Sequence, residues 1–377
     1  MNAAVKQIFW PLLLAVVALA LFEIRVRHQM PDFAVYRQAG VRAAHAEPLY
    51  RPEDGHYQFK YLPAFALAMV PFGWLKPDSA KALWYAFSVG WLAIFLRWSV
   101  RALPERRWSE RSLLWLTILL MAKFYGHELT LGQTNLLLGA LLVAALLAIQ
   151  IDHPLVAAGL VGVAAFVKPY ALVLLPWIAV TQGLAPALLS VGVVVTGLAA
   201  PAVLYGWSGN LDLLTQWYRT VTDSTAPNLL VSDNISLAAM WAKWIGPGGV
   251  AAALAAMSGL AALGLGAAIW RKRGQVGAPD YLEFAFLMLL IPLLSPQGWD
   301  YVLVLATPAV VCLVDRWQDT HGAWRWLTGA ALATMGLTIF DIMGRSLYGR
   351  FMALSIVSVC AIVAAVGLAH LRWRSVA

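Results

Sequence analysis

The stretch Val250–Trp270 reads VAAALAAMSGLAALGLGAAIW and contains no charged residue. A transmembrane helix needs about 20 consecutive, mainly apolar residues to cross the ~30 Å hydrocarbon layer of a bilayer. This stretch has that length, so it predicts a membrane-spanning helix. Its many alanines and glycines, from Ala251 to Ala268, indicate close packing against neighbouring helices rather than a binding site.

The composition extends this prediction to the whole chain. Of its 377 residues, 61% are hydrophobic and only 12% are charged, and the mean hydropathy is +0.71. Soluble proteins carry about 25% charged residues, so lipid must replace water around much of this surface. The net charge of +8 comes from basic residues that lie between apolar segments, where they orient helices. We therefore expect membrane lipid and no nucleic acid as a partner.

Similar apolar segments predict an all-α, polytopic membrane protein with about twelve transmembrane helices, forming a single domain over residues 1–377. The candidate spans are Ile8–Ile24, Ala82–Trp98, Leu113–Phe124, Asn135–Gln150, Leu155–Val167, Tyr170–Thr181, Ala185–Tyr205, Val250–Trp270, Tyr281–Leu294, Tyr301–Val314, Trp326–Phe340 and Phe351–His370. Neither the two cysteines nor the seven histidines have metal-ligand spacing, and no nucleotide-binding motif is present. We expect no metal and no cofactor.

The apolar segment Leu62–Leu75 decides the topology. It has only about 14 residues and contains two prolines. If it crossed the membrane, the arginines between residues 97 and 111 would lie outside, against the preference of Lys and Arg for cytoplasmic loops. If it lies along the outer surface, they lie inside, together with Arg271-Lys272-Arg273. We therefore predict a juxtamembrane helix in the outer loop 25–81, cytoplasmic termini, and a multi-pass protein of the inner (plasma) membrane.

Asp32 is the first acidic residue after the first predicted span. It lies in the segment Met30-Pro31-Asp32-Phe33-Ala34-Val35-Tyr36. A carboxylate at the outer water boundary can act as a general base on an acceptor hydroxyl. An aspartate before an apolar-periodic segment is also a common helix N-cap. Position alone does not separate these two interpretations.

The segment His127–Asn135 places a carboxylate and two amides close together at the outer end of a predicted span. Glu128, Gln133 and Asn135 are suited to binding sugar hydroxyls. The alternative is a polar turn between two helices, with Asn135 as the helix cap.

Lys168 stands inside an otherwise continuous apolar run, and no acidic residue lies within ten positions of it. A lysine at this depth must extend to the water boundary, pair with an acid, or bind an anionic ligand. A phosphate group near the membrane surface is a suitable ligand, and Arg345 and Arg350 are further candidates for it. Extension of the side chain towards water is the alternative.

Two further outer links carry amide, hydroxyl, carboxylate and aromatic groups. Their candidate substrate-binding residues are Asn234, Ser236, Trp299 and Asp300. Asp300 has a second interpretation, in which it pairs with Lys168 or an arginine instead of contacting substrate.

At these residues the chain resembles glycosyltransferases of family 87, a branch of the GT-C superfamily that uses polyprenyl-phosphate sugars. The resemblance extends from Asp32 to about Pro308. Its motifs are Asp32-Phe33-Ala34-Val35-Tyr36, Ala39-Gly40, Pro48-Leu49-Tyr50, Phe59-Lys60-Tyr61-Leu62-Pro63, Gly132-Gln133-Thr134-Asn135-Leu136-Leu137, Lys168-Pro169, Asn234-Ile235-Ser236-Leu237, Ser295-Pro296 and Trp299.

The resemblance implies a site facing outside, with Asp32 as the catalytic base and Tyr36 and Tyr61 among the substrate-binding residues. It also implies juxtamembrane helices in the first outer loop. The chain departs from the family where Leu62 stands in a usual Tyr-Pro-Pro and where Asp300-Tyr301 replace a usual histidine. An arginine that often follows the Asn-x-Ser-Leu motif is also absent. These departures leave the sugar and the acceptor open.

The sequence thus predicts an inverting transfer of a hexose (mannose-like) or a pentose from a polyprenyl-phosphate donor to a hydroxyl of a glycan or glycolipid acceptor, with Asp32 as base. The alternative is a lipid or solute transporter or flippase, whose polar residues would line a path. A transporter is expected to carry polar groups through the midplane and to have pseudo-symmetric halves. Here the polar groups collect at one face, and no repeat is visible.

Overall fold

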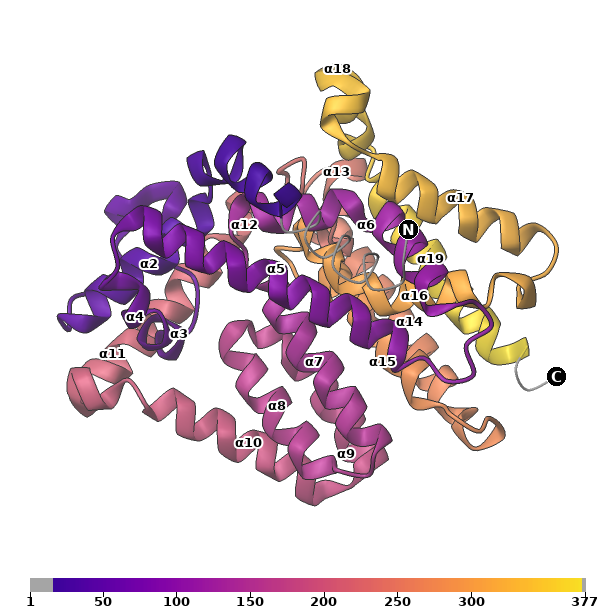
Figure 1. Ribbon diagram of the computed structural model, residues 1–377, viewed down its shortest axis with the longest axis horizontal. Helices are drawn as coiled ribbons and strands as arrows, with labels where there is room; N and C mark the ends of the chain where they lie inside the picture. Colours follow the sequence, from indigo (N-terminus) through magenta and orange to yellow (C-terminus); the bar gives the residue numbers. More distant parts are fainter. Residues whose placement is uncertain (1–15, 375–377) are drawn as a thin grey trace, which may run out of the picture.

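The computed structural model describes residues 16–374, and nearly all of the chain drawn in Figure 1 is helical. Residues 16–24 form the first described helix, and the earlier part of the predicted span Ile8–Ile24 lies outside the described residues. The elements that follow are η1 (Val26–His28), α2 (Pro31–Ala44), η2 (Pro52–Tyr57), α3 (Pro63–Ala68), α4 (Val70–Gly73), α5 (Pro77–Arg101), α6 (Glu110–Leu131), α7 (Asn135–Gln150), α8 (Pro154–Val167), η3 (Pro169–Leu174), α9 (Leu175–Gln182), α10 (Leu184–Ala199), α11 (Ala202–Asp223), α12 (Thr225–Asn228), α13 (Leu237–Ile245), α14 (Gly249–Arg271), η4 (Arg273–Gln275), α15 (Asp280–Leu294), η5 (Asp300–Ala306), α16 (Thr307–Asp315), η6 (Trp317–Asp319), α17 (Ala323–Leu337), α18 (Phe340–Ala353) and α19 (Ile356–Arg374).

The structure confirms a helical membrane protein but does not support the predicted number of about twelve spans. Within residues 16–374, three helices are long and apolar enough to cross a bilayer: α5, α14 with η4, and α19. The number rises to six if each of three bent helix pairs is one span: α6 with α7, α10 with α11 and α12, and α17 with α18.

The count differs because hydropathy measures apolar content and not the direction of the chain. The predicted spans Leu113–Phe124 and Asn135–Gln150 became α6 and α7, which are bent by 119° at a short break. Gly132 forms that break with a φ of 69°, a left-handed conformation that glycine adopts without steric cost. The predicted spans Tyr170–Thr181 and Tyr301–Val314 each divide into a 3-10 helix and a short α-helix.

Helix α14 contradicts the prediction of close packing. Only 6% of its most apolar window is buried within the described chain. Val250, Met257 and Leu260 are each more than 60% exposed. A helix with so much exposed apolar surface requires lipid around it, and only part of its small residues, such as Gly266 beside Phe286, pack against a neighbouring helix.

The loop formed by residues 25–81 folds against α5 and the ends of other helices. The segment Leu62–Leu75 contains α3 and α4, which have six and four residues and are too short to cross a bilayer. Both pack against α2. A buried cluster that includes Phe33, Phe65 and Trp84 joins this loop to α5 and fixes the position of α2. Its placement at the outer membrane surface stays a prediction.

The topology is testable by labelling single cysteines. The native Cys312 and Cys360 are buried, whereas Glu53 and Arg111 are exposed at opposite ends of the helical core. We expect Glu53→Cys to react with a membrane-impermeant maleimide only from outside, and Arg111→Cys only from inside. Reaction of both cysteines from the same side would contradict the interfacial placement of Leu62–Leu75. The unsubstituted chain is the control for background labelling.

Candidate active site

The side-chain amide of Gln133 lies at the centre of a buried polar network. Its Nε2 donates a hydrogen bond to Asp32 Oδ2 at 2.8 Å, and its Oε1 accepts one from Lys168 Nζ at 3.2 Å. The three residues come from different parts of the chain: the break after α6, the first turn of α2, and the end of α8. The fold therefore brings together a predicted base, a predicted amide and a predicted phosphate-binding cation.

Tyrosine hydroxyls complete this network. Tyr36 and Tyr61 donate to Gln133 Oε1 at 3.0 and 3.2 Å, and their hydroxyl oxygens lie 2.6 Å apart. Gln133 Nε2 also donates to the Tyr301 hydroxyl at 3.2 Å. Tyr36 and Tyr61 were predicted site residues, whereas Tyr301 was not. Its position directly after Trp299-Asp300, in a segment rich in polar and aromatic groups, was the available signal.

The turn that carries Gln133 is closed by Glu128 and Asn135. Glu128 Oε1 accepts from Asn135 Nδ2 at 2.5 Å, and Oε2 accepts from the Asn135 backbone N–H at 3.1 Å. Both residues are fully buried. The N-cap of α7 is Thr134, with Asn135 as the first helical residue, so the alternative of Asn135 as the cap is wrong. The turn interpretation agrees with these contacts, and a sugar-binding role stays a prediction.

Asp32 is held in place by the residue before its helix. Met30 is the N-cap of α2, with a left-handed φ of 62°, and its backbone N–H donates to the Thr130 carbonyl at 2.9 Å. Asp32 is the second residue of the helix, so the interpretation of Asp32 as the N-cap is wrong. Its position in the first turn places its carboxylate at the positive end of the helix dipole, which stabilises a negative charge.

Two opposing effects act on the Asp32 carboxyl. Burial raises its pKa above the ordinary value, because desolvation disfavours the charged form. The hydrogen bond from Gln133 and the positive charge of Lys168 act in the opposite direction, with smaller contributions from His56 and Lys60. The net direction is upward, which suits a group that must accept a proton.

The Lys168 side chain points into the protein and not towards water. The residue is only 8% exposed. Its Nζ lies 5.7–5.8 Å from the ring centroids of Tyr61, Tyr170 and Tyr301. Extension to the water boundary is therefore wrong for this structure. Arg345 and Arg350 are exposed on α18, which projects at the edge of the molecule, far from α2 in Figure 1.

Asn234, Ser236 and Trp299 belong to a neighbouring contact between two links. Asn234 Nδ2 donates to the Pro296 carbonyl at 2.9 Å, and a short β-bridge pairs Asn234 with Trp299. Ser236 Oγ accepts from the Ala239 backbone N–H at 3.0 Å and caps α13. These contacts join the α12–α13 link to the α15–η5 link, so they position Tyr301 from a distance.

Asp300 forms a buried ion pair with Lys123 at 2.8 Å, and each side chain is only 2% exposed. His127 Nδ1 lies 3.8 Å from the same carboxylate. The predicted partners, Lys168 or an arginine, are therefore wrong. Lys123 was overlooked, although a charged residue inside the predicted span Leu113–Phe124 was a signal.

The cavities in the described part of the chain include one near α2 and one near the ends of α16 and α19. The first, of about 300 Å³, lies between α2 and η2, and Gln38, Tyr57 and Phe59 are among its lining residues. The second has a volume of about 620 Å³, and none of the predicted site residues lines either cavity. Within residues 16–374, no group of three or more His, Cys, Asp or Glu side chains is placed to hold a metal ion.

Comparison with known proteins gives one match. The model of glycosyltransferase family 87 matches residues 59–296, which is more than half of the chain and includes Tyr61, Gln133 and Lys168. Asp32 precedes the matched residues. Neither a curated protein nor a solved structure matches the chain.

Gly132 is expected to control the position of Gln133. An added Cβ would lie 2.7 Å from Phe33 Cβ, and the φ of 69° is unfavourable for alanine. We predict that Gly132→Ala lowers the free energy of unfolding by about 1–3 kcal/mol, measured by denaturation in detergent. Gly126→Ala is the control, because Gly126 has open space around it within α6; it should stabilise by up to about 1 kcal/mol. Equal stability of the two variants would contradict this role of Gly132.

Proposed function

The chain belongs to glycosyltransferase family 87 and is a membrane glycosyltransferase, and on this premise we propose that it uses a polyprenyl-phosphate sugar as donor. The sugar is a hexose (mannose-like) or a pentose, and the acceptor is a hydroxyl of a glycan or glycolipid on the outer face of the inner (plasma) membrane. The bundle is of the GT-C type, and the site is the network around Gln133.

The observation that carries the proposal is the pairing of Asp32 and Lys168 through Gln133. A neutral amide has donors on its nitrogen and an acceptor at its oxygen. The Gln133 nitrogen faces the carboxylate and its oxygen faces the ammonium group. One side chain therefore separates a proton acceptor from a cation suited to phosphate. In sugar transfer from a lipid phosphate, a base can accept the acceptor proton while a cation stabilises the charge on the leaving phosphate.

In the proposed reaction, Asp32 accepts the proton of the acceptor hydroxyl as the hydroxyl oxygen forms a bond to the anomeric carbon. The bond between that carbon and the phosphate oxygen breaks, and its electron pair remains on the phosphate. Attack from the face opposite the phosphate inverts the anomeric centre. General-base catalysis of this kind contributes about 10²–10⁴-fold to the rate.

Lys168 stabilises the charge that develops on the leaving phosphate. Its hydrogen bond to Gln133 uses one of three ammonium N–H donors, so further donors can turn to phosphate oxygens. Burial strengthens this interaction, because the effective dielectric constant is lower there than in water. The three surrounding tyrosine rings keep the group in the site. A lipid monophosphate requires less charge neutralisation than a nucleotide diphosphate, which agrees with a single buried lysine.

We predict that Asp32→Asn lowers the rate of sugar transfer by at least about 100-fold. Asparagine retains an oxygen that can accept from Gln133 but cannot accept the proton. Transfer is measured with purified protein, a panel of polyprenyl-phosphate sugars and candidate acceptors. Donor binding and thermal stability should stay near those of the unsubstituted protein. The wild-type rate should fall as pH decreases through the raised Asp32 pKa, because protonation removes the base.

Asp78→Asn is the matched control for this variant. Asp78 lies at the start of α5 near the same loop, and its ion pair with Arg27 is exposed, so its loss should change activity little. An Asp32→Asn enzyme that retains more than about a tenth of wild-type turnover would remove Asp32 from the mechanism.

We predict that Lys168→Met weakens donor binding by at least about tenfold, because a charge-assisted hydrogen bond to phosphate contributes about 1.5–3 kcal/mol. Binding is measured by titration with a polyprenyl-phosphate sugar in detergent. Lys76→Met is the control, since Lys76 is exposed before α5. The same donor affinity in both variants would show that Lys168 does not bind the phosphate.

A further inference from the structure

The cavity of about 620 Å³ lies at the end of the molecule opposite the candidate active site. It lies beside the link between α5 and α6, at the end of α16 and at the end of α19. Helix α6 begins just after that link and ends at Gly132 beside Gln133. With 22 residues, α6 places the cavity about 33 Å from the Gln133 network.

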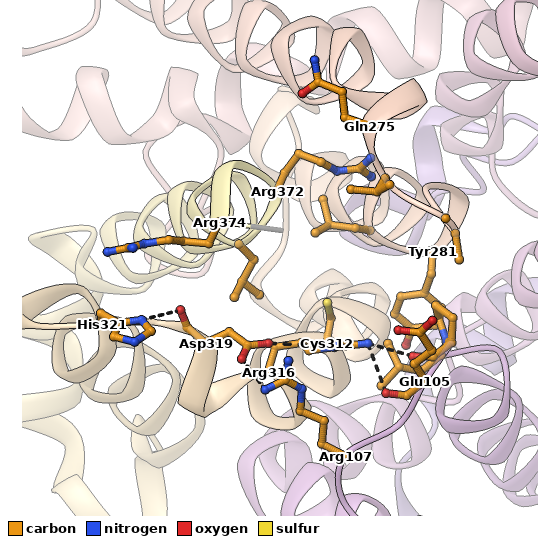
Figure 2. A pocket seen from close by; sticks show the side chains of 17 residues that line it. Glu105, Arg107, Gln275, Tyr281, Cys312, Arg316, Asp319, His321, Arg372 and Arg374 are labelled. Atoms are coloured by element: carbon orange, nitrogen blue, oxygen red, sulfur yellow. Dashed lines mark hydrogen bonds and ion pairs between the residues drawn. The ribbon is translucent and has the colours of Figure 1, made fainter. Parts of the chain in front are cut away.

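Arginines dominate the polar lining of this cavity, as Figure 2 shows. The lining contains four arginines, Arg107, Arg316, Arg372 and Arg374, and two carboxylates, Glu105 and Asp319. Asp319 is already paired with Arg107 and lies 4.0 Å from Arg316. Asp315 lies 3.5 Å from Arg316, and Glu283 lies 3.4 Å from Arg372. Within residues 16–374, Arg374 forms no ion pair, so its positive charge remains available at the cavity.

Arg372 provides the observation that points to a ligand. The residue is only 2% exposed. Its Nη2 donates to the Pro279 carbonyl at 2.8 Å and lies 3.4 Å from Glu283 Oε1. Its Nη1 is buried and has no hydrogen-bond partner among residues 16–374. Buried donors without a partner are rare because each one costs about 1–3 kcal/mol. An anion in the cavity would supply the missing acceptor.

The surroundings favour a lipid as the source of that anion. The cavity adjoins one end of each of the three apolar spans, at the ends of α5, of α14 with η4, and of α19. It therefore lies where a bilayer meets water. Leu103 and Leu282 add apolar wall beside the arginines. Basic pockets between the ends of transmembrane helices bind the headgroups of anionic lipids, and the arginine fork matches phosphate oxygens.

We propose that this arginine-lined cavity binds the phosphate group of an anionic membrane lipid, at a site separate from the candidate active site. The proposal does not depend on which sugar is transferred or on the role of Asp32. A soluble phosphate shares the same recognition chemistry, and the experiment distinguishes the two sources.

The test is native mass spectrometry of the purified full chain in detergent, titrated with phosphatidic acid. Diacylglycerol with the same acyl chains and inorganic phosphate are the other two probes. We expect one phosphatidic acid to be retained per cavity, with at least tenfold weaker binding of diacylglycerol. Inorganic phosphate that competes at equal concentration would support the phosphate chemistry and identify a soluble source.

The variants locate the binding. Arg374 is exposed, so Arg374→Gln should fold normally and weaken phosphatidic acid binding by about tenfold or more. Arg372→Lys keeps the positive charge but loses the planar set of guanidinium donors, and it should weaken phosphatidic acid binding as well. Arg271→Gln is the matched control, an exposed arginine at the end of α14 that does not line the cavity. Lys168→Met removes the proposed donor-phosphate contact and should leave this binding unchanged.

Unchanged phosphatidic acid affinity in both Arg374→Gln and Arg372→Lys would overturn the proposal. So would diacylglycerol binding as tight as that of phosphatidic acid, since the phosphate would then contribute nothing. Loss of binding in Lys168→Met alone would assign the lipid to the candidate active site and refute the separate site. That result would leave the proposed glycosyl transfer intact, so the two proposals can fail independently.

Discussion

The site depends on the orientation of one amide group. Gln133 can place its nitrogen towards a carboxylate and its oxygen towards an ammonium, and reversing it would face donor to donor and acceptor to acceptor. The charges of Asp32 and Lys168 therefore fix the amide, and the amide fixes the separation between them. The left-handed Gly132 and the buried Glu128–Asn135 pair hold the backbone that carries it.

The burial of Lys168 makes its ammonium group a favourable partner for an anion. Removing an ammonium group from water costs several kcal/mol. The attraction of Asp32 and Glu128 offsets part of that cost, but Glu128 is already occupied by Asn135 and Asp32 by Gln133. The cation thus has charged neighbours without a direct ion pair in the described structure. A phosphate that enters the site meets a desolvated cation that is already oriented.

The sequence identified the residues that meet in the Gln133 network, but it did not predict how the chain brings them together. Asp32, Gln133 and Lys168 were recognisable because ionisable and amide groups are conspicuous in an apolar chain. Their mutual contacts depend on bends in the chain, and hydropathy does not record the 119° break between α6 and α7. For the same reason, the number of spans was overestimated. Lys123 was missed because one charge inside a long apolar run hardly changes its mean hydropathy, yet it is the partner of Asp300.

Helix α14 shows what lipid demands of a sequence. Only 6% of its apolar window is fully buried within the described chain, so the exposed side chains need only be compatible with hydrocarbon. Exchanges among Ala, Leu, Val and Met on that surface keep its apolar character and change few contacts within the protein. The helix lies inside the matched residues 59–296. The turn that carries Gln133 is constrained by specific hydrogen bonds, whereas the exposed face of α14 is constrained mainly by its apolar character.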